Sequence, residues 1–307
     1  MKFQLPEPVA VLDLATSDGA TIRIRRHGNI NGPRLVLSHG NGFAIDAYFP
    51  FWCRFLPDCD VIVFDQRNHG WNPRHHARGH TQQQMAEDLE VILRVITTQF
   101  GKRRTAAALH SLSTTVSLLH AMKYGFSWDS LILFDPPLAP PPGHPQHSIA
   151  RNFELALHDR ARQRRRTFQS ADELAENFRS ARRMRRWVPG GAELMAHAIT
   201  RPANGGGVEL VCPPEFEADI YVQNANSPAW TTLSELADKL LVVSSDYEAP
   251  DADPPGLVSR ALKSDFGIEV VPVRDTGHLL QIERPREVEA IVREHLRSRG
   301  FEIAGIS

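Results

Sequence analysis

The stretch Leu109-His110-Ser111-Leu112-Ser113 lies where a short apolar run, 105–109, meets a segment with helical periodicity that begins at Leu112. A serine on a sharp strand-to-helix turn is raised above the sheet, with its hydroxyl exposed and the next backbone N–H directed at a substrate oxygen. This arrangement suits acyl transfer, because the nucleophile and half of an oxyanion hole come from one turn. Ser111 is therefore the candidate nucleophile, and Leu112 is a candidate oxyanion donor.

Short, unbroken apolar runs recur on both sides of this turn. They lie at 35–37, 61–64, 131–134, 240–243 and 269–273. Such runs are typical of parallel strands covered by helices on both faces. Helical patterns alternate with them at 82–98, 112–124, 257–263 and 285–298. Two alternating segments near the N-terminus, separated by Ser17-Asp18-Gly19, predict a hairpin. The sequence thus predicts a doubly wound α/β fold with a mostly parallel sheet.

The alternation breaks between residues 138 and 237. A stiff proline-rich segment, 136–142, leads into helical patterns at 150–162, 171–182 and 192–199. We therefore expect a first part of the α/β core at 1–137, a helical lid inserted at 138–237, and a second part of the core at 238–307. Residues 151–201 contain 12 arginines and six acidic residues. We interpret this segment as a solvated or salt-bridged lid surface; a basic rim that favours anionic substrates is the alternative.

The overall composition excludes several classes of protein. With 42% apolar and 23% charged residues and a net charge of -1, the chain has an ordinary globular composition and no global field that would recruit nucleic acid. No run of about 18 apolar residues and no signal-peptide pattern occur, so we expect no membrane insertion and a cytoplasmic protein. The three cysteines read as idle thiols rather than a disulfide framework. The sequence leaves open whether the chain forms a homo-oligomer.

Two further segments carry groups that a serine nucleophile requires. The loop Ser38-His39-Gly40-Asn41-Gly42-Phe43 follows the run 35–37, and an N–H from residues 41–43 can face a developing oxyanion because glycine lets the backbone approach a ligand. The segment Asp275-Thr276-Gly277-His278 follows the last predicted strand. A serine hydroxyl is a weak nucleophile at neutral pH, and histidine is the base best matched to that pH. We predict that His278 is this base.

Two polar loops receive other interpretations. The segment 65–70 ends a predicted strand, and we expect its polar groups to brace the neighbouring loops. The histidine-rich loop 69–80 suggests a metal, but it lacks cysteines and carboxylates at ligand spacing. We therefore predict neither a metal site nor a cofactor.

Together, His39-Gly40-Asn41-Gly42-Phe43, Ser111 and Gly277-His278 resemble the oxyanion loop, nucleophile and catalytic histidine of the α/β-hydrolase superfamily, in its lid-bearing serine esterase and lipase branch. The resemblance covers residues 8–137 and 238–300. It departs at Leu109 and Ser113, where the family pattern Gly-x-Ser-x-Gly has glycines, and Leu109 implies a shifted neighbour or a looser elbow. A serine nucleophile argues against the epoxide-hydrolase and haloalkane-dehalogenase branches, which use a carboxylate there.

The resemblance also implies a carboxylate that completes a triad, at a position it leaves open. The family usually places this acid after the strand equivalent to 240–243, where Glu248 matches best and Asp246 and Asp251 are further candidates. Some relatives carry it after the preceding strand, where Asp135 stands.

The activity that the resemblance implies is hydrolysis of a small-molecule ester. The substrate would be a carboxylic ester with a small or medium acyl chain, cleaved through an acyl-enzyme without a cofactor. The same triad acting on lactones, thioesters or C–C bonds, or as a cofactor-free perhydrolase, is one alternative. A hydrolase fold that serves as a non-catalytic ligand receptor is another.

Overall fold

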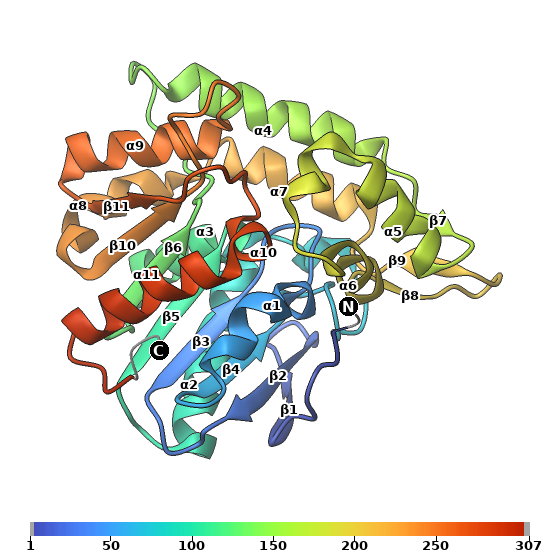
Figure 1. Ribbon diagram of the computed structural model, residues 1–307, viewed down its shortest axis with the longest axis horizontal. Coiled ribbons are helices and arrows are strands. Elements are labelled where there is room, and N and C mark those ends of the chain that lie inside the picture. Colours follow the sequence, from blue (N-terminus) through green and yellow to red (C-terminus); the bar gives the residue numbers. More distant parts are fainter. Residues whose placement is uncertain (1–2, 304–307) are drawn as a thin grey trace.

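The computed structural model describes residues 3–303, which surround an eight-stranded sheet (Figure 1). The strand order is β1-β2-β4-β3-β5-β6-β10-β11. These strands are β1 (Ala10–Ala15), β2 (Thr21–Gly28), β3 (Arg34–Ser38), β4 (Asp60–Phe64), β5 (Thr105–His110), β6 (Ser130–Phe134), β10 (Leu240–Ser244) and β11 (Glu269–Pro272). The pairs β1–β2 and β2–β4 are antiparallel, and all the other pairs are parallel. The predicted mostly parallel sheet and N-terminal hairpin are therefore confirmed.

Helices cover both faces of this sheet, because its buried strands are apolar on both sides. Along β3, Leu35 and Leu37 enter one core cluster and Val36 the other, as the alternation of side chains along a strand requires. The first cluster packs under α1 (Phe49–Trp52) and α11 (Pro285–Ser298), and the second packs under α2 (Gln82–Phe100), α3 (Leu112–Tyr124) and α9 (Pro254–Phe266). Full burial of each large aliphatic side chain contributes about 2 kcal/mol.

Shorter helical turns complete the core. They are η1 (Ile45–Tyr48), η2 (Cys53–Phe55), η3 (Ala77–Gly79) and α10 (Leu280–Glu283). The long helix α2 begins where the Thr81 hydroxyl accepts a hydrogen bond from the Gln84 N–H (3.1 Å), and it ends at Gly101 with a φ of 79°. Within residues 3–303, no helix combines the length and the apolar composition that crossing a bilayer requires.

Most of the chain between β6 and β10 lies at the top and right of Figure 1, whereas its last part, with α8 (Leu233–Leu236), lies at the left beside β11 and packs into the second core cluster. Its elements are α4 (His147–Arg162), β7 (Thr167–Phe168), α5 (Ala171–Ser180), η4 (Arg182–Arg186), α6 (Gly191–Ala198), β8 (Thr200–Pro202), β9 (Val208–Leu210), α7 (Pro214–Asn224), η5 (Pro228–Thr232), α8 (Leu233–Leu236) and η6 (Ala237–Lys239). The three predicted helices correspond to α4, α5 and α6. Helix α7 was not predicted, because buried polar residues such as Glu217 and Asn224 interrupt its apolar pattern.

Several arginines of this insert are paired with its own acids. Arg164 lies 2.6 Å from Glu217, and Arg201 lies 2.9 Å from Glu209. Arg179 pairs with both Glu176 and Glu193. These contacts support the interpretation of the arginine-rich segment as salt-bridged structure.

Candidate active site

Ser111 stands on the turn between β5 and α3 in the left-handed region, with a φ of 50°. A non-glycine residue in this region raises the free energy of the fold by of order 1 kcal/mol. The turn is held by a hydrogen bond from the Ser111 N–H to the Phe134 carbonyl on β6 (3.0 Å). Gly40 supplies the room beside this turn, because a Cβ at that position would lie 3.1 Å from the Ser111 Cβ. Leu109 is buried in the core cluster beneath α2 and α3, so the bulk that departs from the family pattern is absorbed by the core.

The structure brings Ser111, His278 and Asp135 into one row. The Ser111 Oγ lies 3.0 Å from His278 Nε2, and His278 Nδ1 lies 2.8 Å from Asp135 Oδ2. Asp135 directly follows β6 and is fully buried, and its Oδ1 accepts hydrogen bonds from the Ser245 N–H (2.9 Å) and hydroxyl (3.0 Å). Burial opposes the charged imidazole, but the bond to Asp135 and its charge outweigh burial, so the pKa of His278 is raised.

The favoured candidate for the acid, Glu248, does not lie at His278. Its side chain is 60% exposed, and the nearest cation is Arg274 at 3.9 Å. The other candidates of that loop also point elsewhere: Asp246 accepts hydrogen bonds from the N–H groups of Glu248 and Asp275, and Asp251 lies 3.9 Å from Arg186.

The neighbouring strands explain this correction. β6 and β10 are adjacent and parallel, so acids that follow either strand reach the same edge of the sheet. Asp135 sits directly at the end of its strand, whereas Glu248 lies in an outward turn several residues past β10. The geometry therefore replaces Glu248 with Asp135 as the partner of the histidine.

Two of the four predicted oxyanion donors are engaged elsewhere. The Gly42 N–H donates to His69 Nε2 (3.1 Å), and the Phe43 N–H donates to the Gly40 carbonyl (3.2 Å). Leu112 is the first residue of α3, where an N–H has no partner inside the helix. The Asn41 N–H likewise donates to no group among residues 3–303. The N–H groups of Asn41 and Leu112 are thus the two left for a substrate oxygen.

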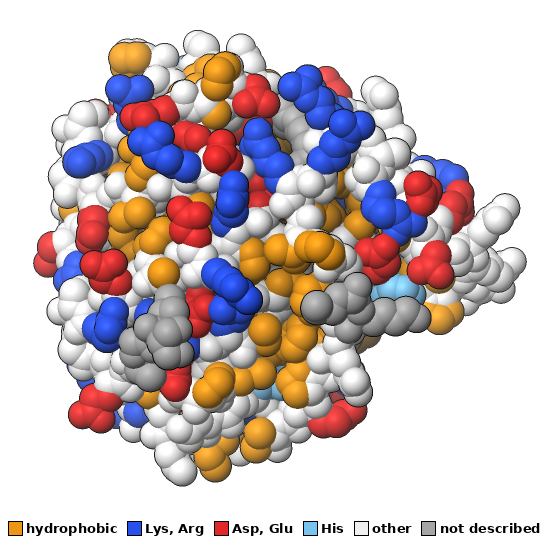
Figure 2. Space-filling view, viewed as in Figure 1, with side chains coloured by type: hydrophobic (Ala, Val, Ile, Leu, Met, Phe, Trp, Pro, Cys, Tyr) orange, Lys and Arg blue, Asp and Glu red, His pale blue; other side chains and the backbone are white. Residues whose placement is uncertain are grey.

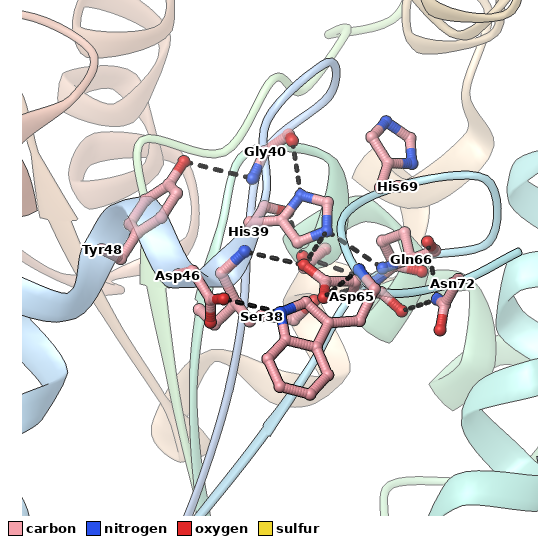
Figure 3. Close-up of polar contacts among 12 residues, drawn as sticks. Ser38, His39, Gly40, Asp46, Tyr48, Asp65, Gln66, His69 and Asn72 are labelled. Carbon is pink, nitrogen blue, oxygen red and sulfur yellow. Dashed lines mark hydrogen bonds and ion pairs between the residues drawn. The ribbon is translucent and has the colours of Figure 1, made fainter. Parts of the chain in front are cut away.

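A buried polar network holds the loop that carries Asn41 (Figure 3). His39 Nε2 accepts a hydrogen bond from the Gln66 N–H (3.0 Å), and its Nδ1 donates to the Gly40 carbonyl (2.8 Å). Burial lowers the pKa of His39, so the ring is neutral and can accept at one nitrogen. Asp65 accepts from the Ile45 N–H (2.8 Å). The bracing role predicted for residues 65–70 is confirmed by these contacts.

The insert also contacts this loop. The Asn41 side-chain amide donates to the backbone carbonyl of Glu217 on α7 (2.7 Å). Gly42 has a φ of 73°, and a Cβ there would come 2.6 Å from the carboxyl carbon of Glu217. Only glycine fits both the backbone angle and this close approach, so Gly42 is required where the insert meets the core.

A directional chain of hydrogen bonds joins the oxyanion loop to the histidine loop. His110 Nε2 donates to the His278 carbonyl (2.8 Å), because a carbonyl can only accept. His110 Nδ1 must then accept from the Tyr48 hydroxyl (2.7 Å), whose oxygen accepts from the Gly40 N–H (3.3 Å). Burial lowers the pKa of His110 well below its usual value, which keeps this neutral tautomer. Tyr48 and His110 thus hold the His278 loop against the turn at Ser111; sequence reasoning did not single out Tyr48, and it indicated only packing for His110.

We expect Tyr48→Phe to lower kcat by about tenfold while KM changes little, because the loop that carries His278 loses its anchor and small displacements of reacting groups are costly. The unpaired nitrogen of His110 should also lower the free energy of unfolding by about 1–3 kcal/mol. Steady-state kinetics and thermal unfolding measure both effects. Tyr124→Phe, at an exposed position on α3, is the matched control. A Tyr48→Phe protein with the original kcat would contradict the anchoring role.

His69 and His80 of the histidine-rich loop 69–80 are buried rings whose pKa values are lowered by burial. His80 stacks on His69 with ring centroids 5.7 Å apart, and burial lowers the pKa of His80 to about 3. Burial likewise lowers the pKa of His27 to about 4. Among the described residues, no three His, Cys, Asp or Glu side chains come together as a metal site would need.

The architecture and the turn after β5 define the class of protein. A mostly parallel sheet with a serine raised on a strained strand-to-helix turn is the arrangement of α/β hydrolases. The chain belongs to the alpha/beta hydrolase family, whose model matches residues 35–291.

Individual relatives are distant. The chain is 24% identical to epoxide hydrolase A of Mycobacterium tuberculosis (strain ATCC 25618 / H37Rv), over 92% of this chain and 96% of that protein. Among solved structures, E-2-(acetamidomethylene)succinate hydrolase is 19% identical with a TM-score of 0.71, covering 94% and 100% of the two chains. A thermophilic esterase from Thermogutta terrifontis is 21% identical with a TM-score of 0.65, covering 95% and 99%. At these identities the solved structures establish the shared fold.

Proposed function

We propose that this protein is a serine hydrolase of carboxylic esters with small or medium acyl chains. The observation that carries the proposal is the row Ser111 Oγ, His278 Nε2 and Nδ1, and Asp135 Oδ2, with contacts of 3.0 and 2.8 Å. Such a row activates a hydroxyl that is otherwise a weak nucleophile. Two unengaged N–H groups, of Asn41 and Leu112, are available for the oxyanion.

The proposed reaction has two halves. In the first, the Ser111 Oγ bonds to the ester carbonyl carbon while His278 takes the serine proton, and the alcohol leaves with that proton. In the second, His278 takes a proton from water, the hydroxide attacks the acyl-enzyme, and the carboxylic acid leaves as Ser111 regains its proton. Asp135 holds the histidine with Nδ1 protonated and stabilises the imidazolium. Each oxyanion donor contributes about 3 kcal/mol to the lowering of the barrier.

The residue at the turn favours esters over epoxides, even though one relative is an epoxide hydrolase. Attack of a serine hydroxyl on an epoxide carbon would form an ether, which has no carbonyl for water to attack. A carboxylate nucleophile would instead form an ester that water can cleave. Ser111 therefore supports acyl substrates, and thioesters and lactones fit the same chemistry.

We further propose that the insert between β6 and β10 is a lid, since α7 contacts the loop that carries Asn41. The cytoplasmic location and a homo-oligomeric state stay predictions from the sequence.

Labelling with a fluorophosphonate probe tests the proposal. We expect a covalent adduct on Ser111, located by mass spectrometry of the digested protein, and turnover of p-nitrophenyl esters with the highest rates for short acyl chains. A folded protein that neither reacts with the probe nor hydrolyses any ester would favour the receptor alternative and contradict the proposal.

A further inference from the structure

Three polar side chains line one face of α7, the helix that contacts the loop carrying Asn41. We call them the polar stripe. Glu217, Tyr221 and Asn224 are spaced four and three residues apart, which places them on one face of the helix. The Tyr221 hydroxyl donates to Glu217 Oε1 (3.4 Å), and Asn224 donates to Glu154 Oε2 on α4 (2.8 Å). Hydrogen-bonding groups, rather than aliphatic side chains, thus form this face of the insert.

One end of the stripe contacts the loop that carries Asn41, and the other end bonds to Glu154 on α4. At one end the Glu217 carbonyl accepts from Asn41, whose own N–H is a candidate oxyanion donor. At the other end, Glu154 lines a cavity of about 10 Å³ together with Pro137 and Leu138, just past the end of β6 at Asp135. The charge of Glu154 also acts on His278. Each end of the stripe is thus linked to a group of the proposed active site, to Asn41 at one end and, through the charge of Glu154, to His278 at the other.

Two acceptor atoms, one near each end of this stripe, lack a hydrogen-bond donor among the described residues. The Asn41 Oδ1 is buried and bonds to no described residue. Its orientation is fixed, because the Glu217 carbonyl only accepts and must face the amide N–H groups of Asn41. Glu154 is 5% exposed, and its Oε1 accepts no hydrogen bond from any residue within 3–303. A buried acceptor without a donor, such as the Asn41 Oδ1, is costly, and a ligand that supplies the donor relieves that cost.

The negative charges near His278 indicate which hydrogen-bond donors a substrate could carry. Asp253 and Glu154 both act on His278 with negative charge, and the nearby Arg164 is already paired with Glu217. Burial raises the pKa of Glu154 to about 7, as expected for a carboxyl with a single donor. This setting disfavours anionic substrates and suits neutral hydroxyl or amide N–H groups and amines.

We propose that Glu154 and the Asn41 side chain form a recognition site for hydrogen-bond donors, so that the preferred substrates are esters that carry a hydroxyl or amino group close to the scissile bond rather than plain alkyl esters. This inference rests on the proposed ester hydrolysis at Ser111 and names its substrate class.

Matched ester pairs test the inference in the unmodified protein. Aryl glycolate and aryl propionate differ by a hydroxyl in place of a methyl on the acyl side, and 2-hydroxyethyl and propyl benzoate differ in the same way on the alcohol side. At a pH well above 7, where Glu154 is ionised, we expect kcat/KM to favour the hydroxyl member of at least one pair by about tenfold or more, since a hydrogen bond to a charged acceptor has this size. Ratios below twofold in both pairs would overturn the inference.

Glu154→Gln then assigns the preference to the carboxyl. The glutamine oxygen can still accept from Asn224, but its amide presents a donor where Glu154 Oε1 presents an acceptor. The hydroxyl-to-methyl ratio should therefore fall by about tenfold. Asp159→Asn, an exposed change on the same helix with a side chain 75% accessible, should leave the ratio as it is. An equal loss on both members of each pair would show that Glu154 only supports α7, and would overturn its recognition role.

The failure of this inference is distinguishable from failure of the proposed function. Equal hydrolysis of both members, together with a fluorophosphonate adduct on Ser111, overturns only the recognition site. No turnover of any pair and no adduct on folded protein overturns both.

Discussion

Replacing Ser111 with alanine should lower kcat for an activated ester by about 10⁵- to 10⁶-fold, with the fold intact. In the proposed reaction this hydroxyl bonds to the acyl carbon, and no other nucleophile lies within hydrogen-bond reach of His278 Nε2 among the described residues. Residue 111 keeps a φ of 50° in the alanine variant, and the buried contacts of the turn stay in place, so the variant should fold. Stopped-flow and steady-state assays with p-nitrophenyl acetate measure the loss.

Ser113→Ala is the matched control, because it removes a hydroxyl two residues away that bonds the His39 carbonyl and not His278. This variant should keep turnover within about tenfold of the original, as expected for loss of one structural hydrogen bond. Full turnover by folded Ser111→Ala would place the chemistry elsewhere.

Asp135→Asn should lower kcat by about 10⁴-fold. The asparagine amide can donate to His278 Nδ1, which would force the histidine proton onto Nε2 and remove the acceptor for the Ser111 proton. The change also removes the charge and the hydrogen bond that raise the pKa of His278 against burial. The residual activity requires a neutral histidine, so its acid limb should move to lower pH than in the unmodified protein.

Glu248→Gln separates the two assignments of the acid. Glu248 is exposed and distant from His278, so this variant should retain the original kcat and the original pH profile. A loss of activity in Glu248→Gln larger than that in Asp135→Asn would contradict the placement of the acid after β6. pH–rate profiles of the two variants, measured side by side, decide the question.

The sequence predicted the sheet, the helices that flank it and the pairing of Ser111 with His278, because periodicity and the ends of apolar runs determine where strands finish. It did not determine the acid, since Asp135 and Glu248 follow adjacent strands and only the turn geometry separates them. The anchoring pair Tyr48 and His110 was also out of reach. Their contact joins residues far apart in the chain, and each alone has the pattern of an ordinary buried ring.

Helix α7 is an element that the sequence pattern did not predict at all. Its buried Glu217 and Asn224 contradict the rule that polar residues face solvent. The Glu217 side chain is paired with Arg164 of the insert, and the Asn224 side chain bonds to Gln82 on α2 and to Glu154 on α4. Amphipathic patterns therefore fail where a helix covers a polar site. A buried polar position in this inserted helix marks a contact with another polar group.

The neutral rings buried in this fold have a consequence for its behaviour in acid. An unfolded chain takes up protons on its histidines below about pH 6.5, whereas His80 and His27 remain unprotonated down to about pH 3 and 4. Their folded pKa values lie below the unfolded ones, so the stability they confer is complete above pH 6.5 and is lost as the pH falls toward 4. Each of these two rings should lower the free energy of unfolding by about 3 kcal/mol across that window, in addition to the loss from ion-paired carboxylates such as Asp13 and Glu87, whose pKa values are lowered by Arg23 and Lys123.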